Sequence, residues 1–210
     1  PKAKSQGEAK SQREVQILAE FVTSAAGAGD FPRDRLPEVA LVGRSNVGKS
    51  SLINALVRQP LARTSATPGK TRLANIYRVQ RGSMPACYLV DLPGYGYARA
   101  PRPGEGSAEF NQITDAFFER PGQRAALLLV DSRHPGLWSD LNAWQWLATR
   151  LSARAVVGTK VDKLTNAERV RHAREMENVF KMPVALVSAR TGEGLDELWK
   201  MIASLPRTAA

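Results

Sequence analysis

A loop with two glycines, a lysine and a serine could bind a chain of phosphates. Apolar residues 39–42 predict a buried strand before the loop, and the apolar spacing of 51–56 predicts a helix after it. Strand, Gly-x-x-x-x-Gly-Lys-Ser and helix together are typical of a P-loop, in which backbone N–H groups and a helix N-terminus surround an anion. We expect Lys49 to reach the β- and γ-phosphates and Ser50 to bind Mg²⁺. The nucleotide-binding residues predicted here are Gly43, Arg44, Ser45, Asn46, Val47, Gly48, Lys49, Ser50 and Ser51.

An aspartate far along the chain could select the base. Apolar residues 155–158 predict a strand, which runs into Thr159, Lys160, Val161 and Asp162. The carboxylate of Asp162 can accept hydrogen bonds from N1–H and the N2 amino group of guanine. Adenine offers neither donor, so the buried charge would stay unpaired. The aliphatic stem of Lys160 could cover the base plane. These residues predict guanine.

A further strand at 184–187 ends where it could complete the base pocket. Its last residue is Val187, and the backbone N–H groups of Ser188, Ala189 and Arg190 could reach O6 of guanine. Thr-Lys-x-Asp alone also fits a solvated loop. Its order after the P-loop and before Ser-Ala-Arg, each at a strand end, predicts GTP and GDP as ligands.

Asp91, Leu92, Pro93 and Gly94 follow another apolar segment at 86–90. We expect Asp91 to hold Mg²⁺ through a water molecule and the Gly94 N–H to bind the γ-phosphate. Loss of that phosphate would free the segment, as in a nucleotide-dependent switch. A plain turn is the alternative for this sequence taken alone.

A second switch is expected in residues 64–71, where a threonine hydroxyl must bind Mg²⁺ in the GTP state. Thr67 and Thr71 are both candidates on chemistry alone. The nucleotide-binding residues expected around this segment are Gly69, Lys70, Thr71, Arg72 and Leu73.

Four motifs resemble the EngB family of bacterial GTP-binding proteins, in the Era/EngA/EngB branch of translation-factor-like GTPases. They are the P-loop continued through Ser-Leu-Ile-Asn, Thr-Pro-Gly-Lys-Thr, Asp-Leu-Pro-Gly-Tyr-Gly-Tyr-Ala at 91–98 and Thr-Lys-Val-Asp-Lys-Leu. The resemblance runs from about residue 20 to 204, and residues 131–134 also resemble the family. It implies Mg²⁺ ligation by Ser50 and Thr71, and a role in large ribosomal subunit assembly linked to normal cell division and septation. Residues 1–15 and the Pro/Gly-rich stretch 101–106 fit the family poorly.

Length and patterning predict one core. The chain has 210 residues and is 43% hydrophobic, enough for one sizeable domain. Apolar strands that alternate with helical stretches at 139–151 and 166–180 predict an α/β P-loop GTPase fold, a mostly parallel six-stranded sheet with helices on both faces. We expect an N-terminal tail, helix and linker at 1–36, with the linker at Gly27 to Pro37. The G domain should span 37–206 and a short tail 207–210.

The composition favours a cytoplasmic protein. No apolar run approaches the length of a membrane span, and residues 1–10 lack a signal peptide's apolar core. The single cysteine fits a reducing compartment. His134 and His172 lack metal-ligand spacing, and the clustered Trp138, Trp144 and Trp146 are interpreted as packing residues. We expect no membrane partner and a monomer.

The charge suggests a polyanionic partner. The net charge is +10, and no Asp or Glu occurs from Val39 to Val90. This acid-free window favours contact with ribosomal RNA of a large-subunit precursor, because Arg and Lys neutralise phosphates. A solvated basic face without a partner is the alternative. No RNA-binding module is recognisable, so sequence-specific readout is not expected. The window's cations are Arg44, Lys49, Arg58, Arg63, Lys70, Arg72, Arg78 and Arg81.

The catalytic residues predict slow hydrolysis. Many GTPases follow Asp-x-x-Gly with a glutamine that orients the attacking water, whereas this chain has Tyr95. Asn46 occupies the position where related GTPases ligate a potassium ion, which could replace an arginine finger. Alternatively, Asn46 only satisfies N–H groups of its own loop. The predicted catalytic set is Lys49, Asn46, Thr71 and Gly94.

Two functions remain open. One is a weak, Mg²⁺-dependent GTPase that docks on a ribosomal precursor in its GTP state. The other is a GTP-dependent scaffold of the division machinery, in which hydrolysis is incidental. The acid-free window favours the first, because a septal protein partner has no obvious need of it.

Overall fold

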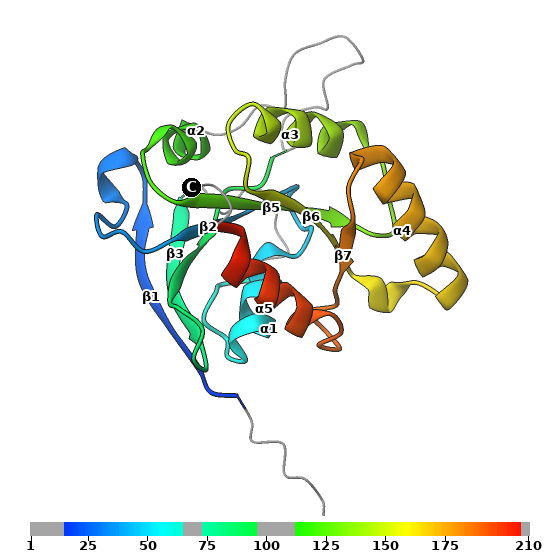
Figure 1. The fold of residues 1–210 in the computed structure, drawn as a ribbon, viewed down its shortest axis with the longest axis horizontal. Helices are drawn as coiled ribbons and strands as arrows, with labels where there is room; N and C mark the ends of the chain where they lie inside the picture. The colour runs from blue at the N-terminus through cyan, green and yellow to red at the C-terminus, as the bar shows by residue number, and fades with distance from the viewer. Residues whose placement is uncertain (1–14, 65–72, 96–111, 207–210) are drawn as a thin grey trace, which may run out of the picture.

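A seven-stranded sheet forms the centre of the molecule (Figure 1). The computed structural model describes residues 15–64, 73–95 and 112–206. The spatial strand order is β1-β3-β4-β2-β5-β6-β7. The strands are β1 Ile17–Ala25, β2 Glu38–Gly43, β3 Ala74–Arg81, β4 Cys87–Asp91, β5 Arg124–Asp131, β6 Arg154–Thr159 and β7 Val184–Leu186. The helices are α1 Lys49–Val57, α2 Gln112–Glu119, α3 Trp138–Ala148, α4 Asn166–Phe180 and α5 Leu195–Ser204.

The sheet is parallel from β4 to β7 in its spatial order and antiparallel at the β1 edge. Strand β2 pairs in parallel with both β4 and β5, and β5–β6 and β6–β7 are also parallel. Strands β3 and β1 run antiparallel to their neighbours. Every residue of β2 is buried, as expected for a parallel strand covered on both faces. The predicted α/β fold is therefore confirmed.

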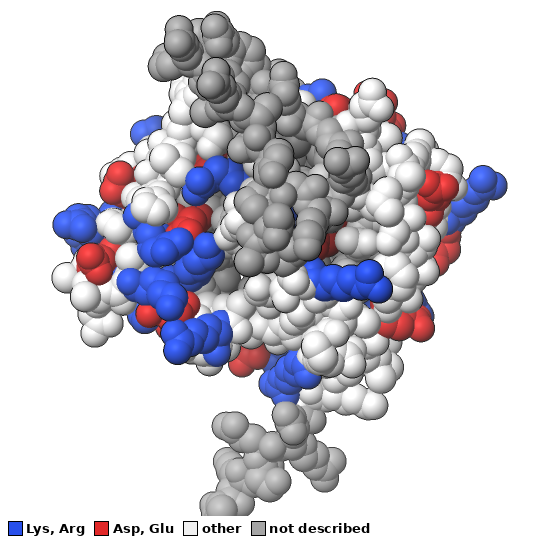
Figure 2. All heavy atoms as spheres, turned by 180° about the vertical axis from the view of Figure 1, so that it is seen from behind, with Lys and Arg blue, Asp and Glu red and all other residues white. Residues whose placement is uncertain are grey.

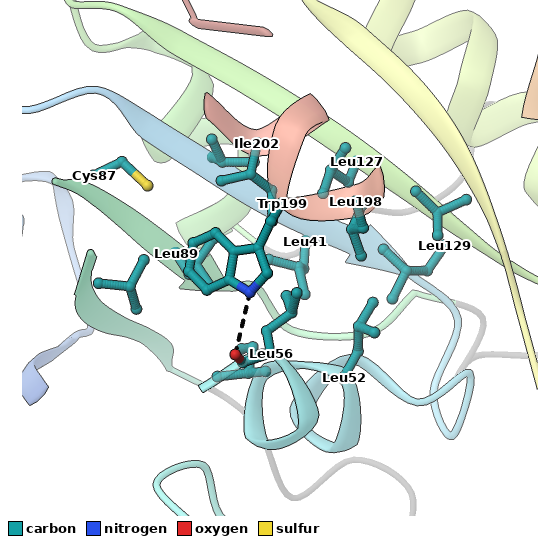
Figure 3. Close-up of a cluster of buried hydrophobic side chains, with 14 of the residues drawn as sticks. Leu41, Leu52, Leu56, Cys87, Leu89, Leu127, Leu129, Leu198, Trp199 and Ile202 are labelled. Atoms are coloured by element: carbon teal, nitrogen blue, oxygen red, sulfur yellow. Dashed lines mark hydrogen bonds between the residues drawn. The ribbon is translucent and has the colours of Figure 1, made fainter. Parts of the chain in front are cut away.

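Helices cover both faces and enclose two apolar clusters. Helices α1 and α5 pack on one face, while α2 and α3 cover the other (Figure 1). In the first cluster, Leu52 and Leu56 of α1 meet Leu198 of α5 beneath the central strands (Figure 3). The indole Nε1 of Trp199 donates a hydrogen bond to the Leu56 carbonyl oxygen at 3.2 Å. This bond gives the polar end of the buried indole a partner.

The sequence prediction was wrong at the N-terminal edge. The helix expected after the polar tail is strand β1, which makes the sheet seven-stranded rather than six-stranded. Strand β1 pairs with β3 along its length, with a register shift between Phe21 and Thr23. The Leu-Ala-Glu content of this segment suits a helix, but pairing with β3 decides its structure. The 3-10 turn Ala28–Asp30 follows, inside the predicted linker.

Helix α4 begins and ends where the sequence predicts. Thr165 caps its N-terminus by accepting a hydrogen bond from the Glu168 backbone N–H, and the Thr165 backbone N–H in turn donates to the Glu168 carboxylate. Between β7 and α5, Gly194 has a φ of +74°, and a Cβ there would lie 2.1 Å from the Leu186 carbonyl oxygen. Only glycine fits that turn. Within the described ranges, none of the helices is long and apolar enough to cross a membrane.

Candidate nucleotide site

The predicted P-loop joins β2 to α1 at the carboxyl edge of the sheet. Gly43 lies against its neighbours so closely that a Cβ would be 2.8 Å from Val47 Cγ1 and 2.9 Å from the Leu129 carbonyl oxygen. Asn46 has a φ of 62° and Gly48 a φ of 110°. These left-handed residues turn the chain into the start of α1, as a loop around an anion requires.

Lys49 is buried within this loop. Its ammonium donates hydrogen bonds to the carbonyl oxygens of Gly43 at 3.1 Å and Arg44 at 3.3 Å. Burial lowers the pKa of Lys49, while the nearby Asp91 carboxylate acts in the opposite direction. The lysine is thus held at the loop, at the position predicted to meet the phosphates.

Ser50 and Asp91 form a hydrogen-bonded pair of oxygen ligands. The Ser50 hydroxyl donates to Asp91 Oδ2 at 2.6 Å, and within the described residues the buried Oδ1 has no hydrogen-bond partner. Burial raises the pKa of Asp91, against the opposing effects of Lys49 and the bond from Ser50. A hydroxyl next to a buried, partly unsatisfied carboxylate fits a hard cation such as Mg²⁺.

The predicted base-binding segments enclose a pocket of roughly 260 Å³ beside the P-loop. Asp162 Oδ1 accepts a hydrogen bond from the Ser188 hydroxyl at 2.8 Å, and its side chain is only 10% exposed. The Ser188 oxygen in turn accepts from the backbone N–H groups of Arg190 and Thr191. The pocket is lined by Val47, Gly48, Ser51, Leu52, Thr159, Lys160, Asp162, Lys163, Val187, Ala189 and Arg190.

Two side chains join the base-binding loop to the P-loop. Lys160, at a φ of 61°, donates to the Asn46 carbonyl oxygen at 2.7 Å. The Thr159 hydroxyl donates to the Val47 carbonyl oxygen at 2.9 Å. Val161 is fully buried, and its N–H points to the Val187 carbonyl oxygen at 3.4 Å.

Asp131, at the end of β5, holds Lys160 from the other side. Its Oδ2 lies 3.0 Å from the Lys160 ammonium, and Arg133 donates to both carboxylate oxygens. Burial alone would raise the pKa of Asp131, but the hydrogen bonds from Arg133 and Lys160 outweigh it and hold the pKa well below its ordinary value. Asp131 therefore carries a negative charge that fixes Lys160 in place. The sequence drew attention to residues 131–134 only through family resemblance.

The loop after β4 lies directly on the P-loop. A Cβ on Gly94 would be 2.8 Å from the Ser45 backbone nitrogen. Leu92 is fully buried, and Pro93 follows it as a buried residue. Tyr95, the residue in place of the expected glutamine, is 3% exposed, and its hydroxyl donates to Asp140 Oδ1 at 2.7 Å. Sequence reasoning missed Asp140, because an acid in the first turn of a helix is a common capping feature.

Several predictions for the first switch concern residues outside the described part of the chain. This holds for Thr67, Gly69, Lys70, Thr71 and Arg72, and for the stretch 101–106. Leu73 is described, and its side chain is 40% exposed.

The acid-free window of the sequence is not free of acids in space. Arg78 pairs with Glu20 of β1 at 3.4 Å, and Arg81 forms an ion pair with Asp196 of α5. Arg44 pairs with Asp140 at 3.2 Å. Acids from outside the window therefore neutralise part of its charge. Trp144 and Trp146 pack against the core as interpreted, whereas Trp138 is 47% exposed, so the interpretation is wrong for that residue.

Comparison with known proteins identifies a GTPase domain in this chain. The family model described as "50S ribosome-binding GTPase" matches residues 38–181. The probable GTP-binding protein EngB of Pelotomaculum thermopropionicum is 42% identical over 191 residues, covering 88% of this chain and 93% of that protein. The protein of the same description from Solibacter usitatus is 43% identical, covering 89% of this chain and 95% of that protein.

Solved structures show the same fold. A crystal structure of Era in complex with MgGDPNP and nucleotides 1506–1542 of 16S ribosomal RNA aligns with a TM-score of 0.67 and 24% identity. The alignment covers 81% of this chain and 57% of the Era chain. A crystal structure of a probable GTP-binding protein EngB aligns with a TM-score of 0.54 and 22% identity over 81% of this chain and 99% of that one.

Proposed function

The chain belongs to the EngB family of GTP-binding proteins, and from that premise we propose that it is a slow, Mg²⁺-dependent GTPase switch in large ribosomal subunit assembly. It binds guanine nucleotide and is a GTPase, as its family and GTPase domain show. The slow rate, the metal, the residue roles and the ribosomal task are parts of the proposal. A need for the protein in division and septation would then follow from ribosome supply.

The contact between Asp162 and Ser188 carries the assignment of the base pocket. Their hydrogen bond holds the carboxylate inside a pocket that opens beside the P-loop. One Asp162 oxygen would accept from guanine N1–H and the other from the N2 amino group. The Lys160 stem would lie over the base while its ammonium stays on Asn46.

Mg²⁺ would be held by Ser50 and Thr71 directly and by Asp91 through a water. The short Ser50–Asp91 contact supports the first and third of these roles. When bound, the cation would neutralise charge on the β- and γ-phosphates. Lys49 would reach the same phosphates from its place against Gly43 and Arg44. The Gly94 N–H would bind the γ-phosphate and so make its loop sensitive to hydrolysis.

The buried position of Tyr95 supports slow hydrolysis. Its side chain is 3% exposed and bonded to Asp140, so it presents no group to an attacking water. Asn46 would ligate a potassium ion beside the phosphates, and this ion would supply the positive charge that an arginine finger gives elsewhere. Hydrolysis would then be faster in potassium than in sodium salts.

Ribosomal RNA would meet a basic surface near the guanine pocket. Lys and Arg side chains gather, with some acids between them, at the edge of the molecule where helix α4 lies (Figure 2). Arg171 and Arg174 are exposed on that helix. Arg78 and Arg81 are paired to acids, so we propose the exposed Arg171 and Arg174 as the phosphate contacts. Helix α4 also carries Glu168, Glu175 and Glu177.

Co-sedimentation with ribosomal subunits tests the proposal. We expect the protein to sediment with the large subunit or its precursor when loaded with a non-hydrolysable GTP analogue, and to remain in the supernatant with GDP. Absence from the subunit with either nucleotide would overturn the ribosomal role and leave the division scaffold. Failure to bind guanine nucleotide at all would overturn the site assignment itself.

A further inference from the structure

One carboxylate outside the predicted nucleotide motifs links three parts of the GTPase site. Asp140, in the first turn of α3, has no exposed surface. Its Oδ1 accepts a hydrogen bond from the Tyr95 hydroxyl at 2.7 Å and lies 3.2 Å from Arg44 Nε. Within the described residues its other oxygen, Oδ2, is buried without a hydrogen-bond partner. A buried carboxylate that loses its partners is strongly destabilising, so the contacts with Asp140 hold the side chains of Tyr95 and Arg44 in place.

The backbones of the same two residues are also joined. Arg44 and Tyr95 form a parallel β-bridge, and the Ser45 N–H donates to the Tyr95 carbonyl oxygen at 3.2 Å. Gly94 packs on Ser45 without room for a Cβ. The loop after β4 therefore cannot shift at Gly94 without disturbing either the P-loop or the contact between Tyr95 and Asp140.

We propose that Asp140 is a positioning residue for the GTPase site, which holds Tyr95 and Arg44 so that Gly94 is set for the γ-phosphate and its movement reaches helix α3. This inference rests on the proposed function, because it assigns Gly94 to the γ-phosphate. In this arrangement the side chain at the usual glutamine position serves as a mechanical link to α3.

The start of α3 is placed to pass this movement to the surface. Leu137 and Trp138 lie three and two residues before Asp140 and are 36% and 47% exposed. A shift of Tyr95 would displace Asp140 through their buried hydrogen bond, and Asp140 would move the first turn of α3. The exposed apolar side chains at the start of that helix would then move at the surface. The emission of Trp138 should therefore report the nucleotide state.

Tyr95→Phe tests the link, and Tyr88→Phe is its matched control. Both changes remove, from a buried tyrosine, a hydroxyl that donates to an aspartate at 2.7 Å: the buried Asp140 for Tyr95 and the exposed Asp34 for Tyr88. We expect Tyr95→Phe to weaken binding of a non-hydrolysable GTP analogue by about 5-fold or more while GDP affinity stays within about 2-fold. Tyr88→Phe should leave the ratio of the two affinities unchanged.

The tryptophan signal gives a second readout. In the parent protein, exchange of GDP for the analogue should shift the emission, and Trp138→Phe should remove the shift and so assign it. Tyr95→Phe and Asp140→Asn should also lose it, while Tyr88→Phe keeps it. Equal thermal destabilisation of both tyrosine variants with an unchanged affinity ratio and an intact shift for Tyr95→Phe would overturn the inference. A parent protein that binds the analogue without any shift would overturn it as well. A parent that binds neither nucleotide would instead refute the proposed function.

Discussion

The ammonium of Lys160 lies 2.7 Å from the carbonyl oxygen of Asn46, so the loop that follows β6 is fastened to the loop that follows β2. The first loop is proposed to hold the base and the second the phosphates. The Asp131 carboxylate also accepts a hydrogen bond from this ammonium and so helps to hold the lysine in position. Base recognition and phosphate binding should therefore fail together when the link is removed.

Lys160→Met tests this coupling, because it keeps an apolar stem but loses the ammonium. A hydrogen bond to a charged group is worth about 1.5–3 kcal/mol, so affinity for GDP and GTP should fall together by about 10-fold or more. Fluorescent-nucleotide titration gives the measurement. Lys200→Met is the control, since Lys200 is exposed on helix α5 and does not line the pocket. Unchanged affinity in Lys160→Met would show that the link is not needed.

Asp162→Asn should exchange the preferred base. Loss of a buried charge-paired contact costs about 2–5 kcal/mol, so GTP affinity should fall by about 30-fold or more. The affinity for xanthosine triphosphate should rise, because its C2 oxygen can accept a hydrogen bond from the new amide group. Competition between the two nucleotides measures the change. Parent-like GTP binding by the variant would mean that the base lies elsewhere.

Asp91→Asn should stabilise the nucleotide-free protein while it weakens Mg²⁺-dependent GTP binding. The pKa of Asp91 is raised by burial, so ionising it costs stability that the amide does not cost. A gain of about 1 kcal/mol would raise the melting temperature by about 2–4 °C in a domain of this size.

The same raised pKa fixes the sign of the pH dependence. Below the ordinary aspartate pKa the folded and unfolded chains are both protonated, and Asp91 contributes nothing. Between the ordinary value and the raised folded value, only the unfolded chain loses its proton, so stability falls as pH rises; above the raised value the cost of the buried charge is fully developed. The difference in melting temperature between the parent and Asp91→Asn should therefore shrink as the pH is lowered. An equal difference in melting temperature at acidic and neutral pH would contradict this.

Binding to ribosomal particles should weaken steeply with salt. The slope of log affinity against log salt is about −0.7 to −0.9 for each phosphate neutralised. Reversal of Arg171 and Arg174 to Glu should flatten this slope and leave GTP affinity unchanged, whereas Lys200→Glu on α5 should alter neither. The assay needs a non-hydrolysable analogue and both NaCl and KCl, because potassium is itself proposed to affect hydrolysis. Salt-insensitive binding would argue against an RNA surface.

Local pattern was sufficient to predict much of the fold. The P-loop, helix α4 and the buried parallel strands follow from short-range signals, since each strand is a continuous apolar run and each motif lies at a strand end. Strand β1 was missed because its structure depends on β3. The paired residues of the two strands are between 49 residues (Ala25 and Ala74) and 64 residues (Ile17 and Arg81) apart along the chain. Non-local pairing leaves no local signal.

The sequence also could not show which charges meet. Asp140 and Asp196 lie far along the chain from Arg44 and Arg81, their partners in space. A window counted along the chain therefore overstated the net charge of a surface. The Ser50–Asp91 and Asp162–Ser188 contacts, in contrast, join motif positions that the sequence had already singled out.

Strand β1 also bears on how the protein behaves at high concentration. It lies at the edge of the sheet, and no described strand pairs with its outer side. Leu18, Phe21 and Val22 are 55%, 50% and 40% exposed there. An apolar edge of this kind is a template on which a second chain can add a strand and start aggregation. The charged Glu20 in its middle and the register shift after Phe21 interrupt that template, so their expected role is in solubility and not in the GTPase site.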